Sequence, residues 1–330
     1  MKDFAGRFAV VTGGGTGMGR ELARQLIAEG CSVAMCDVSQ KNMERTIALA
    51  HADGVPQGAK ITAHLADVSD EAQLIAFRDE ALAAHDIDRL HLLFNNAGIG
   101  GGGSIVNTDR VEWERTFDVC WGGVYLGVRT FLPAMLRADE AHIVNTSSVN
   151  GFWASLGPNV SHTAYAAAKF AVKGFTEALV TDLRLTAPHI KCSVVMPGHI
   201  GTEIAANSRK VINHSDDDTL SATELQRARK RLATAGIDAA ALPDAAIQAM
   251  VAEQARRFHD DAPMTAAAAA TVILDGVKAD RWRILVGDDA QSLDKMVRAD
   301  PEAAYEQGFY ERMATEGGWR LNVVAGNRPG

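Results

Sequence analysis

Long apolar runs are missing from this sequence of 330 residues. No stretch of 18 or more consecutive apolar residues occurs, so we expect no transmembrane helix and no membrane partner. The N-terminal residues MKDFAGRFAVVTGGG also lack the apolar stretch of a signal peptide, so we expect a cytoplasmic protein. The composition, 47% hydrophobic and 22% charged, is that of an ordinary globular protein with a sizeable core.

Cysteine is scarce, and neither cysteine nor histidine has the spacing of a metal site. The four cysteines form no CxxC pair, and the ten histidines include no HExxH sequence. We therefore expect no bound metal. We expect the cysteines to be free thiols, as in cytoplasmic proteins. They are Cys31, Cys36, Cys120 and Cys192.

An excess of positive charge is also absent. The formal net charge is −8, so no general basic field would draw the protein to nucleic acid, and we expect no nucleic-acid partner. The one dense basic cluster, RARKR at 227–231, is typical of a solvated helix face. The preceding SATE sequence, Ser221 to Glu224, has the pattern of a capping box at the start of that helix.

Segments typical of strands and helices alternate along the chain. Short apolar runs are followed by stretches with helical apolar spacing, which is the pattern of βαβ units in a parallel sheet covered on both faces. We predict an α/β fold with a single doubly wound parallel sheet of about seven strands. The predicted strands are RFAVVTG, SVAMCD, KITAHLADVSD, LHLLFNNAG, HIVNTSS, KCSVVMPG and WRILVG, and the longest predicted helices span residues 108–136 and 164–185.

Two segments fall outside this alternation. Residues 204–261 are polar at first and then helical, and we expect them to form a helical lid over the substrate. The tail at 288–330 is mixed in composition and ends in AGNRPG, which we expect to be frayed. The sequence has no internal repeat and no linker rich in Pro, Gly or Ser, so we predict one domain over residues 1–330.

A glycine-rich turn separates the first predicted strand from the first predicted helix. Glycines there let backbone amides at a helix N-terminus approach a diphosphate closely, although such a turn can also be purely structural. The strict GxGxxG fingerprint is not matched, because Met18 stands where its last glycine would be. The glycines are Gly13, Gly14, Gly15, Gly17 and Gly19.

The end of the second predicted strand favours a dinucleotide. Asp37 stands there, 20 residues after Gly17. An acidic residue at this place accepts hydrogen bonds from a ribose diol and repels a 2′-phosphate, and no Arg or Lys follows before Lys41. A helix cap or turn residue is the other interpretation of Asp37. We expect NAD rather than NADP as the cofactor.

The sequence TAYAAAKF places a phenol and an ammonium group four residues apart. On a helix, Tyr165 and Lys169 would lie on one face as neighbours. A positive charge close to a phenol lowers the pKa of that phenol, which would suit proton transfer. On its own, such a pair also occurs on ordinary surface helices.

Four motifs together resemble one family. In chain order they are Thr12-Gly13-xxx-Gly17-x-Gly19, Asn95-Asn96-Ala97-Gly98, Ser148 and Tyr165-xxx-Lys169. This order on a βαβ scaffold resembles the short-chain dehydrogenase/reductase family, motif by motif over about residues 6–203 and more loosely to Gly287. The resemblance implies a Rossmann-like fold, a nicotinamide cofactor and hydride transfer.

The resemblance also implies roles for individual residues. Tyr165 resembles the acid/base that exchanges a proton with the substrate oxygen, and Ser148 the hydrogen-bond donor to the carbonyl. Lys169 resembles the residue that lowers the pKa of the tyrosine and holds the nicotinamide ribose. Hydride transfer to a carbonyl makes an alkoxide, so such donors are chemically required. The implied cofactor contacts are Gly13, Thr16, Gly17, Met18, Gly19, Asp37, Val38, Asp67, Val68, Asn96, Ala97, Gly98, Tyr165, Lys169, Pro197, Gly198, Ile200 and Thr202.

Two features depart from the family pattern. Cys120 stands where the family usually has an asparagine that holds a water of the proton relay, and a thiol is a poor hydrogen-bond partner beside an amide. We interpret Cys120 as a small buried residue. The segment from Ser148 to Tyr165 spans 17 positions, longer than is common in the family, and borders the substrate. Its candidate substrate contacts are Asn150, Phe152, Trp153 and His162.

The predicted function is hydride transfer between NAD(H) and a secondary alcohol or ketone, in one dinucleotide-binding catalytic domain. The residues leave the substrate open among steroids, aromatic alcohols, cyclic alcohols and acyl thioesters. A non-catalytic NAD-binding sensor or scaffold is an alternative, as is an epimerase or dehydratase that shares Tyr-xxx-Lys. The two longest predicted helices carry apolar residues on more than one face, so we also expect a homo-oligomer, a dimer or tetramer.

Overall fold

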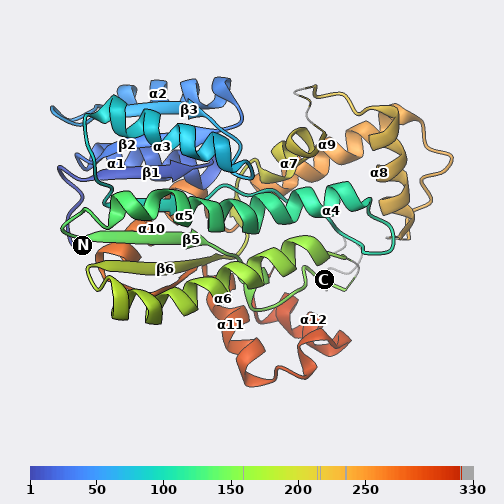
Figure 1. The fold of residues 1–330 in the computed structure, drawn as a ribbon. Helices are drawn as coiled ribbons and strands as arrows, with labels where there is room; N and C mark the ends of the chain where they lie inside the picture. Colours follow the sequence, from blue (N-terminus) through green and yellow to red (C-terminus); the bar gives the residue numbers. More distant parts are fainter. Residues whose placement is uncertain (159, 214, 216, 235, 320, 322–330) are drawn as a thin grey trace.

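A single seven-stranded parallel sheet forms the centre of the molecule (Figure 1). The computed structural model describes residues 1–319 and 321, except residues 159, 214, 216 and 235. The strand order is β3-β2-β1-β4-β5-β6-β9. The strands are β1 (Phe8–Thr12), β2 (Ser32–Asp37), β3 (Ile61–Leu65), β4 (Leu92–Asn95), β5 (Ala141–Thr146), β6 (Ile190–Pro197) and β9 (Arg283–Val286).

Helices cover both faces of this sheet. Strands β1, β4 and β5 are buried along their whole lengths, which explains their apolar sequences. One face packs against α1, α2 and α10, and the other against α3, α5 and α6. The predicted doubly wound α/β fold is therefore confirmed. The helices of the two layers are α1 (Gly17–Ala28), α2 (Gln40–Asp53), α3 (Glu71–His85), α4 (Arg110–Phe117), α5 (Gly123–Met135), α6 (Thr163–Thr186) and α10 (Ala266–Lys278).

The helix predicted over residues 108–136 contains a wider turn. A π-helical turn, η1 (Asp118–Gly122), joins α4 to α5, and the two helices run in line in Figure 1. Such a turn inserts one extra residue into an α-helix, often at a functional site. The adjacent glycines Gly122 and Gly123 have low helix propensity, which lowers the cost of the distortion.

The segment expected as a lid consists of three helices. They are α7 (Ile204–Asn213), α8 (Ala222–Thr234) and α9 (Asp244–Asp260), and they lie together to one side of the sheet in Figure 1. The chain enters and leaves this lid through a two-stranded parallel sheet of β7 (Ile200–Gly201) and β8 (Met264–Thr265). The predicted capping box is present, because Ser221 and Glu224 each accept a hydrogen bond from the backbone N–H of the other.

The tail folds into helices against the body of the protein. It contains α11 (Asp288–Ala299), η3 (Ala303–Tyr305) and α12 (Gln307–Thr315), which lie below α6 in Figure 1. The final AGNRPG, expected to be frayed, lies outside the described residues. Among the described residues, no helix is both long and apolar enough to cross a membrane.

The topology brings three motifs to one edge of the sheet. The glycine turn follows β1, Asn96 follows β4 and Ser148 follows β5, and these three strands are neighbours in the order β1-β4-β5. The order in which strands are added to the sheet reverses between β1 and β4, because β2 and β3 lie on one side of β1 and the later strands on the other. In open α/β sheets, ligands bind at the carboxyl ends of the strands at such a switch point.

Candidate active site

The glycine turn connects β1 directly to α1. Gly13 and Gly17 have φ angles of +69° and +53°, which a residue with a Cβ would adopt only with strain. Helix α1 begins at Gly17, and the preceding Thr16 makes no side-chain cap to its first turn. The backbone N–H groups of such a helix start can bind a diphosphate. The turn therefore has the geometry expected of a dinucleotide site.

Asp37 lies beside this turn at the end of β2. Its carboxylate accepts hydrogen bonds from the backbone N–H groups of Gly15 and Ser39, each at 3.0 Å. Burial raises the pKa of Asp37, although these hydrogen bonds oppose the shift. The side chain of the following residue, Val38, is 45% exposed. An acidic side chain in this position can reach the ribose of a dinucleotide bound at the turn.

The NNAG sequence packs directly on the end of β1. The Thr12 hydroxyl accepts hydrogen bonds from the backbone N–H groups of Asn96 and Ala97, each at 3.0 Å. The Asn96 amide donates to the carbonyl of Thr12 at 3.1 Å. Its Oδ1 atom is buried and has no hydrogen-bond partner among the residues that the structure describes. A buried acceptor without a donor indicates a place for a ligand group.

Asp67 and Val68 follow β3 at the same edge. The carboxylate of Asp67 accepts hydrogen bonds from Arg115 and Ser69. Burial alone would raise the pKa of Asp67, but these hydrogen bonds outweigh burial and lower it. Val68 is buried against Gly123 of α5. Asp67 thus joins the end of β3 to α4.

Ser148, Tyr165 and Lys169 come together where β5 ends and α6 begins. The Lys169 ammonium group donates a hydrogen bond to the carbonyl of Thr146 at 2.8 Å and lies 5.4 Å from the centre of the Tyr165 ring. Ser148 is buried, and its hydroxyl accepts a hydrogen bond from the backbone N–H of Asn150 at 3.1 Å. The hydroxyl donor, the phenol and the ammonium group therefore share one site.

Burial controls the protonation of this group. Burial raises the pKa of Tyr165, and a hydrogen bond with Ser148 only partly opposes the shift. Burial likewise lowers the pKa of Lys169. Lys169 was expected to lower the pKa of the tyrosine, but that pKa is raised, because desolvation by burial is its main determinant. The phenol therefore keeps its proton, the form that a proton donor requires.

Cys120 lies in the core next to this group. Its thiol donates a hydrogen bond to the carbonyl of Ile99 at 3.1 Å and accepts one from the N–H of Ile99 at 3.4 Å. A Cβ added to Gly98 would lie 3.5 Å from the Lys169 Nζ atom and 3.7 Å from the Cys120 Sγ atom, so these two side chains flank Gly98. The prediction that Cys120 is a small buried residue is confirmed, because it is fully buried.

The loop from Pro197 to Thr202 closes the site from the other side. A Cβ added to Gly17 would lie 3.1 Å from the side chain of Thr202, so this loop touches the glycine turn. Ile200 of this loop is buried in the core. Pro197 ends β6 and pairs with Val286 of β9. The sequence PGHIGT is therefore close enough to the glycine turn to contact the same ligand.

The loop between Ser148 and Tyr165 differs from expectation. Trp153 is fully buried and donates a hydrogen bond from its indole N–H to the carbonyl of Ala304 in the tail at 2.8 Å. The amide of Asn150 donates to the carbonyls of Trp153 and Ser155 within the loop. The indole N–H of Trp153 and the amide of Asn150 are thus already hydrogen-bonded within the protein, which argues against a contact of either side chain with the substrate.

His162 stays beside the site. Its ring centre lies 4.6 Å from that of Tyr165, and burial lowers its pKa to about 4. The imidazole is therefore neutral at pH 7. Of the candidate substrate contacts, His162 is the one that the structure brings next to the phenol. Phe152 packs on the buried cluster around Trp153.

These residues fit a nicotinamide dinucleotide. The glycine turn ends at the start of α1, where a diphosphate can bind, Asp37 lies beside the turn, and the buried Asn96 oxygen has no donor among the described residues. Lys169 and Tyr165 stand on α6, where Lys169 binds Thr146 at the end of β5, two strands away from β1. Among the described residues, no cluster of three or more His, Cys, Asp or Glu side chains could hold a metal ion.

Comparison with known proteins identifies the family. The model of the family described as short chain dehydrogenase matches residues 7–213. The chain belongs to this short-chain dehydrogenase family. The match covers β1 to α7 and ends within the lid, so the rest of the lid and the tail lie outside the matched region.

Two relatives and one solved structure extend this comparison. A 3-alpha-(or 20-beta)-hydroxysteroid dehydrogenase of Mycobacterium bovis is 36% identical over 197 residues, 60% of this chain and 70% of that protein. The levodione reductase of Leifsonia aquatica is 33% identical over 211 residues, 64% of this chain and 75% of that protein. The structure of a Burkholderia phymatum short-chain dehydrogenase/reductase in complex with NAD has a TM-score of 0.73 and 30% identity, and the match covers 92% of this chain and 96% of that one.

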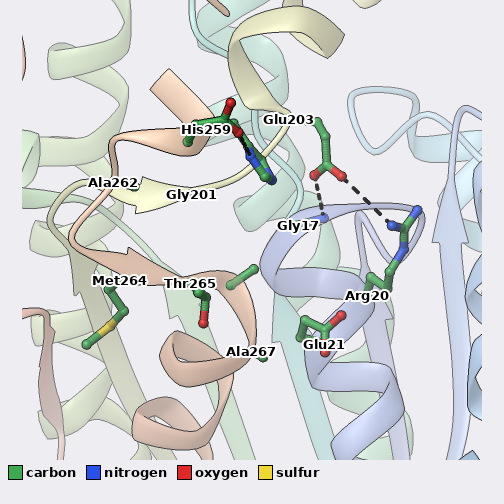
Figure 2. Close-up of a pocket in the computed structure, with 12 residues that line it drawn as sticks. Gly17, Arg20, Glu21, Gly201, Glu203, His259, Ala262, Met264, Thr265 and Ala267 are labelled. Atoms are coloured by element: carbon green, nitrogen blue, oxygen red, sulfur yellow. Dashed lines mark hydrogen bonds and ion pairs between the residues drawn. The ribbon is translucent and has the colours of Figure 1, made fainter. Parts of the chain in front are cut away.

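Sequence reasoning missed the contacts that Glu203, directly before the lid, and lid helix α7 make with the site. Glu203 accepts a hydrogen bond from the backbone N–H of Gly17 at 3.1 Å and lies 3.8 Å from Arg20 (Figure 2). Asn207 donates to the Thr16 hydroxyl at 3.0 Å, and the Ser208 hydroxyl accepts from the N–H of Gly100 at 2.7 Å. The position of Glu203 directly after PGHIGT was the available signal.

A groove opens beside Glu203. Its volume is about 450 Å³, and it lies between α1, the end of α9 and the β7–β8 pair. Figure 2 shows Glu203 pointing from the start of the lid to Gly17 and Arg20 on one side of the groove, with Met264 and Thr265 on the other. The lid is thus bound to the glycine turn at its first residues.

Proposed function

We propose that this chain is an NAD-dependent dehydrogenase or reductase that interconverts a secondary alcohol and a ketone. The observation that carries the proposal is the group of Ser148, Tyr165 and Lys169 next to the glycine turn and NNAG, in which Ser148 and Lys169 are buried and Tyr165 is partly buried. Both relatives described above carry names of hydroxyl or carbonyl chemistry, a hydroxysteroid dehydrogenase and a levodione reductase, which supports the same reaction class.

Each residue of the group has a step that its position suits. In the reductive direction, a bound nicotinamide supplies the hydride. The carbonyl oxygen of the substrate would accept hydrogen bonds from the Ser148 hydroxyl and the Tyr165 phenol. The phenol keeps its proton in the buried site and can deliver it to the developing alkoxide. Lys169, held by the carbonyl of Thr146, would contact the ribose and supply positive charge beside the phenol.

Replacing the phenol tests this reaction. Tyr165→Phe should lower kcat by a factor of about 10² to 10⁴, the range for loss of a general acid–base group, while NADH binding stays near the parent value. Turnover would be followed by absorbance of reduced nicotinamide with a panel of alcohols and ketones, and binding by NADH fluorescence. Tyr125→Phe, which removes a hydroxyl outside the catalytic group and keeps the ring on α5, is the matched control. Turnover by the Tyr165→Phe variant within a few-fold of the parent would remove Tyr165 from the mechanism.

We infer NAD rather than NADP from Asp37. The carboxylate lies beside the glycine turn, where it would bind a ribose diol and repel a 2′-phosphate. Asp37→Ala should reduce the preference in turnover for NAD over NADP. Asp37→Asn removes the charge but keeps a side chain of similar size, so it separates the two effects. Equal or better turnover with NADP by the parent protein would contradict the inference.

We also propose a homo-oligomer built on α5 and α6. Trp121 of η1, Tyr125 of α5 and Phe175 of α6 form an aromatic cluster, with ring centres 5.4–6.3 Å apart. Tyr125 and Phe170 are each 43% exposed. A second copy would cover these rings and bury their apolar surface. Light scattering at micromolar concentration should give a dimer or tetramer, and a monomer mass would reject the proposal.

A further inference from the structure

The tail reaches the active-site loop through one buried carboxylate. Asp289 stands in the first turn of α11 and is 5% exposed. One of its oxygens accepts a hydrogen bond from the backbone N–H of His199 at 2.7 Å, and the other from that of Ala290 at 2.8 Å. The carboxylate therefore bridges α11 and the loop from Pro197 to Thr202.

The loop is shaped to receive this carboxylate. A Cβ added to Gly198 would overlap both oxygens of Asp289, so any larger residue would push the loop and the carboxylate apart. Among the described residues, Asp289 forms no ion pair, so the two backbone N–H groups are its main compensation for burial. A buried carboxylate held in this way costs folding free energy, which suggests a functional reason for it.

His199 connects three parts of the molecule. Its backbone N–H binds Asp289 of the tail, and its ring donates from Nε2 to the carbonyl of Phe258 at 2.7 Å in the last turn of lid helix α9. Three residues farther along, Thr202 touches the glycine turn. Displacement of residue 199 would therefore move the part of the loop that faces the dinucleotide.

We propose that Asp289 is a positioning residue of the reaction, which sets the Pro197–Thr202 loop against the nicotinamide half of the cofactor and so makes α11 part of the active site. This inference rests on the proposed function. Small displacements at a reacting centre are sufficient for a large effect, because a shift of about 1 Å can reduce the rate about a hundredfold.

Helix α11 supplies a matched control. Asp294 lies on the same helix and is 7% exposed, so its burial is close to that of Asp289. Its carboxylate pairs with Arg283 of β9 and with Arg298, and it accepts no hydrogen bond from the Pro197–Thr202 loop. Replacement of Asp294 should destabilise the tail without moving the loop.

The test compares Asp289→Asn with Asp294→Asn. The asparagine has one acceptor oxygen for two N–H groups, so Asp289→Asn should raise the Kd of NADH about tenfold and lower kcat at least tenfold, with the KM of the alcohol near the parent value. Asp294→Asn should lower the melting temperature and leave the Kd of NADH unchanged. A Kd of NADH and a kcat for Asp289→Asn within twofold of the parent values would overturn the proposal. An equal rise in the Kd of NADH for Asp294→Asn would also overturn it.

A second variant keeps the test valid if Asp289→Asn does not fold. Gly198→Ala leaves the carboxylate in place but separates it from the loop, so it should raise the Kd of NADH to the same extent. Where Asp289→Asn and Gly198→Ala both fold, the double variant should raise the Kd of NADH no more than either single variant does. Additive increases in Kd would overturn the proposal. Fluorescence measures NADH binding without turnover. A parent that binds NADH but turns over no alcohol or ketone would therefore contradict the proposed reaction and leave this test intact.

Discussion

The lid and the tail flank the same site but are held by different forces. The lid contains one small apolar cluster, formed around Ala228, Ala239 and Ile247. Ion pairs with partly exposed partners hold its helices, including Arg227 with Asp109 of the body at 2.6 Å. The tail instead buries a large aromatic cluster against the loop that follows Ser148. Its members include Trp153, Leu293, Phe309, Met313 and Trp319.

This difference indicates which region is able to move. Partly exposed ion pairs contribute little free energy, about 0–1 kcal/mol each, whereas a buried aromatic side chain contributes several times more. Regions with few buried apolar contacts open with low free energy. We therefore expect the lid to open for ligands while the tail stays fixed and supports the loops beside the catalytic group.

The largest expected effect tests the two apolar clusters. Trp153→Ala should lower the free energy of unfolding by about 3–5 kcal/mol and the melting temperature with it, because it leaves a cavity between the loop and the tail. Ile247→Ala, in the lid cluster, should leave the main melting transition nearly unchanged and increase proteolysis within residues 204–260. An equal fall in melting temperature for both variants would show that the lid unfolds together with the core.

A smaller effect is expected from acid, through Glu224 in the lid. Burial alone would raise the pKa of Glu224, but hydrogen bonds from Ser221 and Arg209 outweigh it and lower the pKa. A carboxyl whose folded pKa is lowered stabilises the fold fully above its usual pKa near ~4.3, and this stabilisation is lost as pH falls through the folded value. Hydrogen exchange in the lid should therefore accelerate on acidification below that usual pKa.

Glu224→Gln is the control for this pH dependence. It should weaken the lid at neutral pH by about 1–3 kcal/mol, because a hydrogen-bonded charge is lost, and it should reduce the acid response. The tail should respond less to acid, because its two buried carboxylates have opposite effects. Burial raises the pKa of Asp289, so its protonation stabilises the fold, whereas Arg283 and Arg298 lower the pKa of Asp294 in spite of burial, so its protonation destabilises the fold. Unchanged acid sensitivity of the lid in Glu224→Gln would assign the response to other carboxylates.

The smallest expected effect comes from salt. The pair of Arg227 and Asp109 joins α8 to the start of α4, and its side chains are 35% and 62% exposed. Raising the salt concentration to about 1 M screens such pairs and should weaken lid docking by about 0–1 kcal/mol. Arg227→Ala should abolish most of this response, whereas hydrogen exchange in α11 and α12 should not change. A larger effect of salt on hydrogen exchange in the tail than in the lid would contradict the view that ion pairs hold the lid and apolar packing holds the tail.

Residues near each other in the chain carried most of the successful predictions. The strands, the capping box of Ser221 and Glu224, and the burial of Cys120 follow from short patterns of polarity and size. Trp153 shows the limit of such reasoning. An aromatic residue in a loop near Ser148 was expected at the substrate, but its partner is Ala304, which lies 151 residues away in the sequence.

By itself, the sequence determined the doubly wound sheet and the family, because apolar periodicity and glycine spacing act over a few residues and need no distant partner. Only the tertiary structure decided where the tail and the lid meet the site. Glu203 binds Gly17 across 186 residues, and Asp289 binds His199 across 90. Asp289 has no local pattern that distinguishes it from a surface residue, and the backbone donors of both carboxylates exist only when the distant segments have packed together.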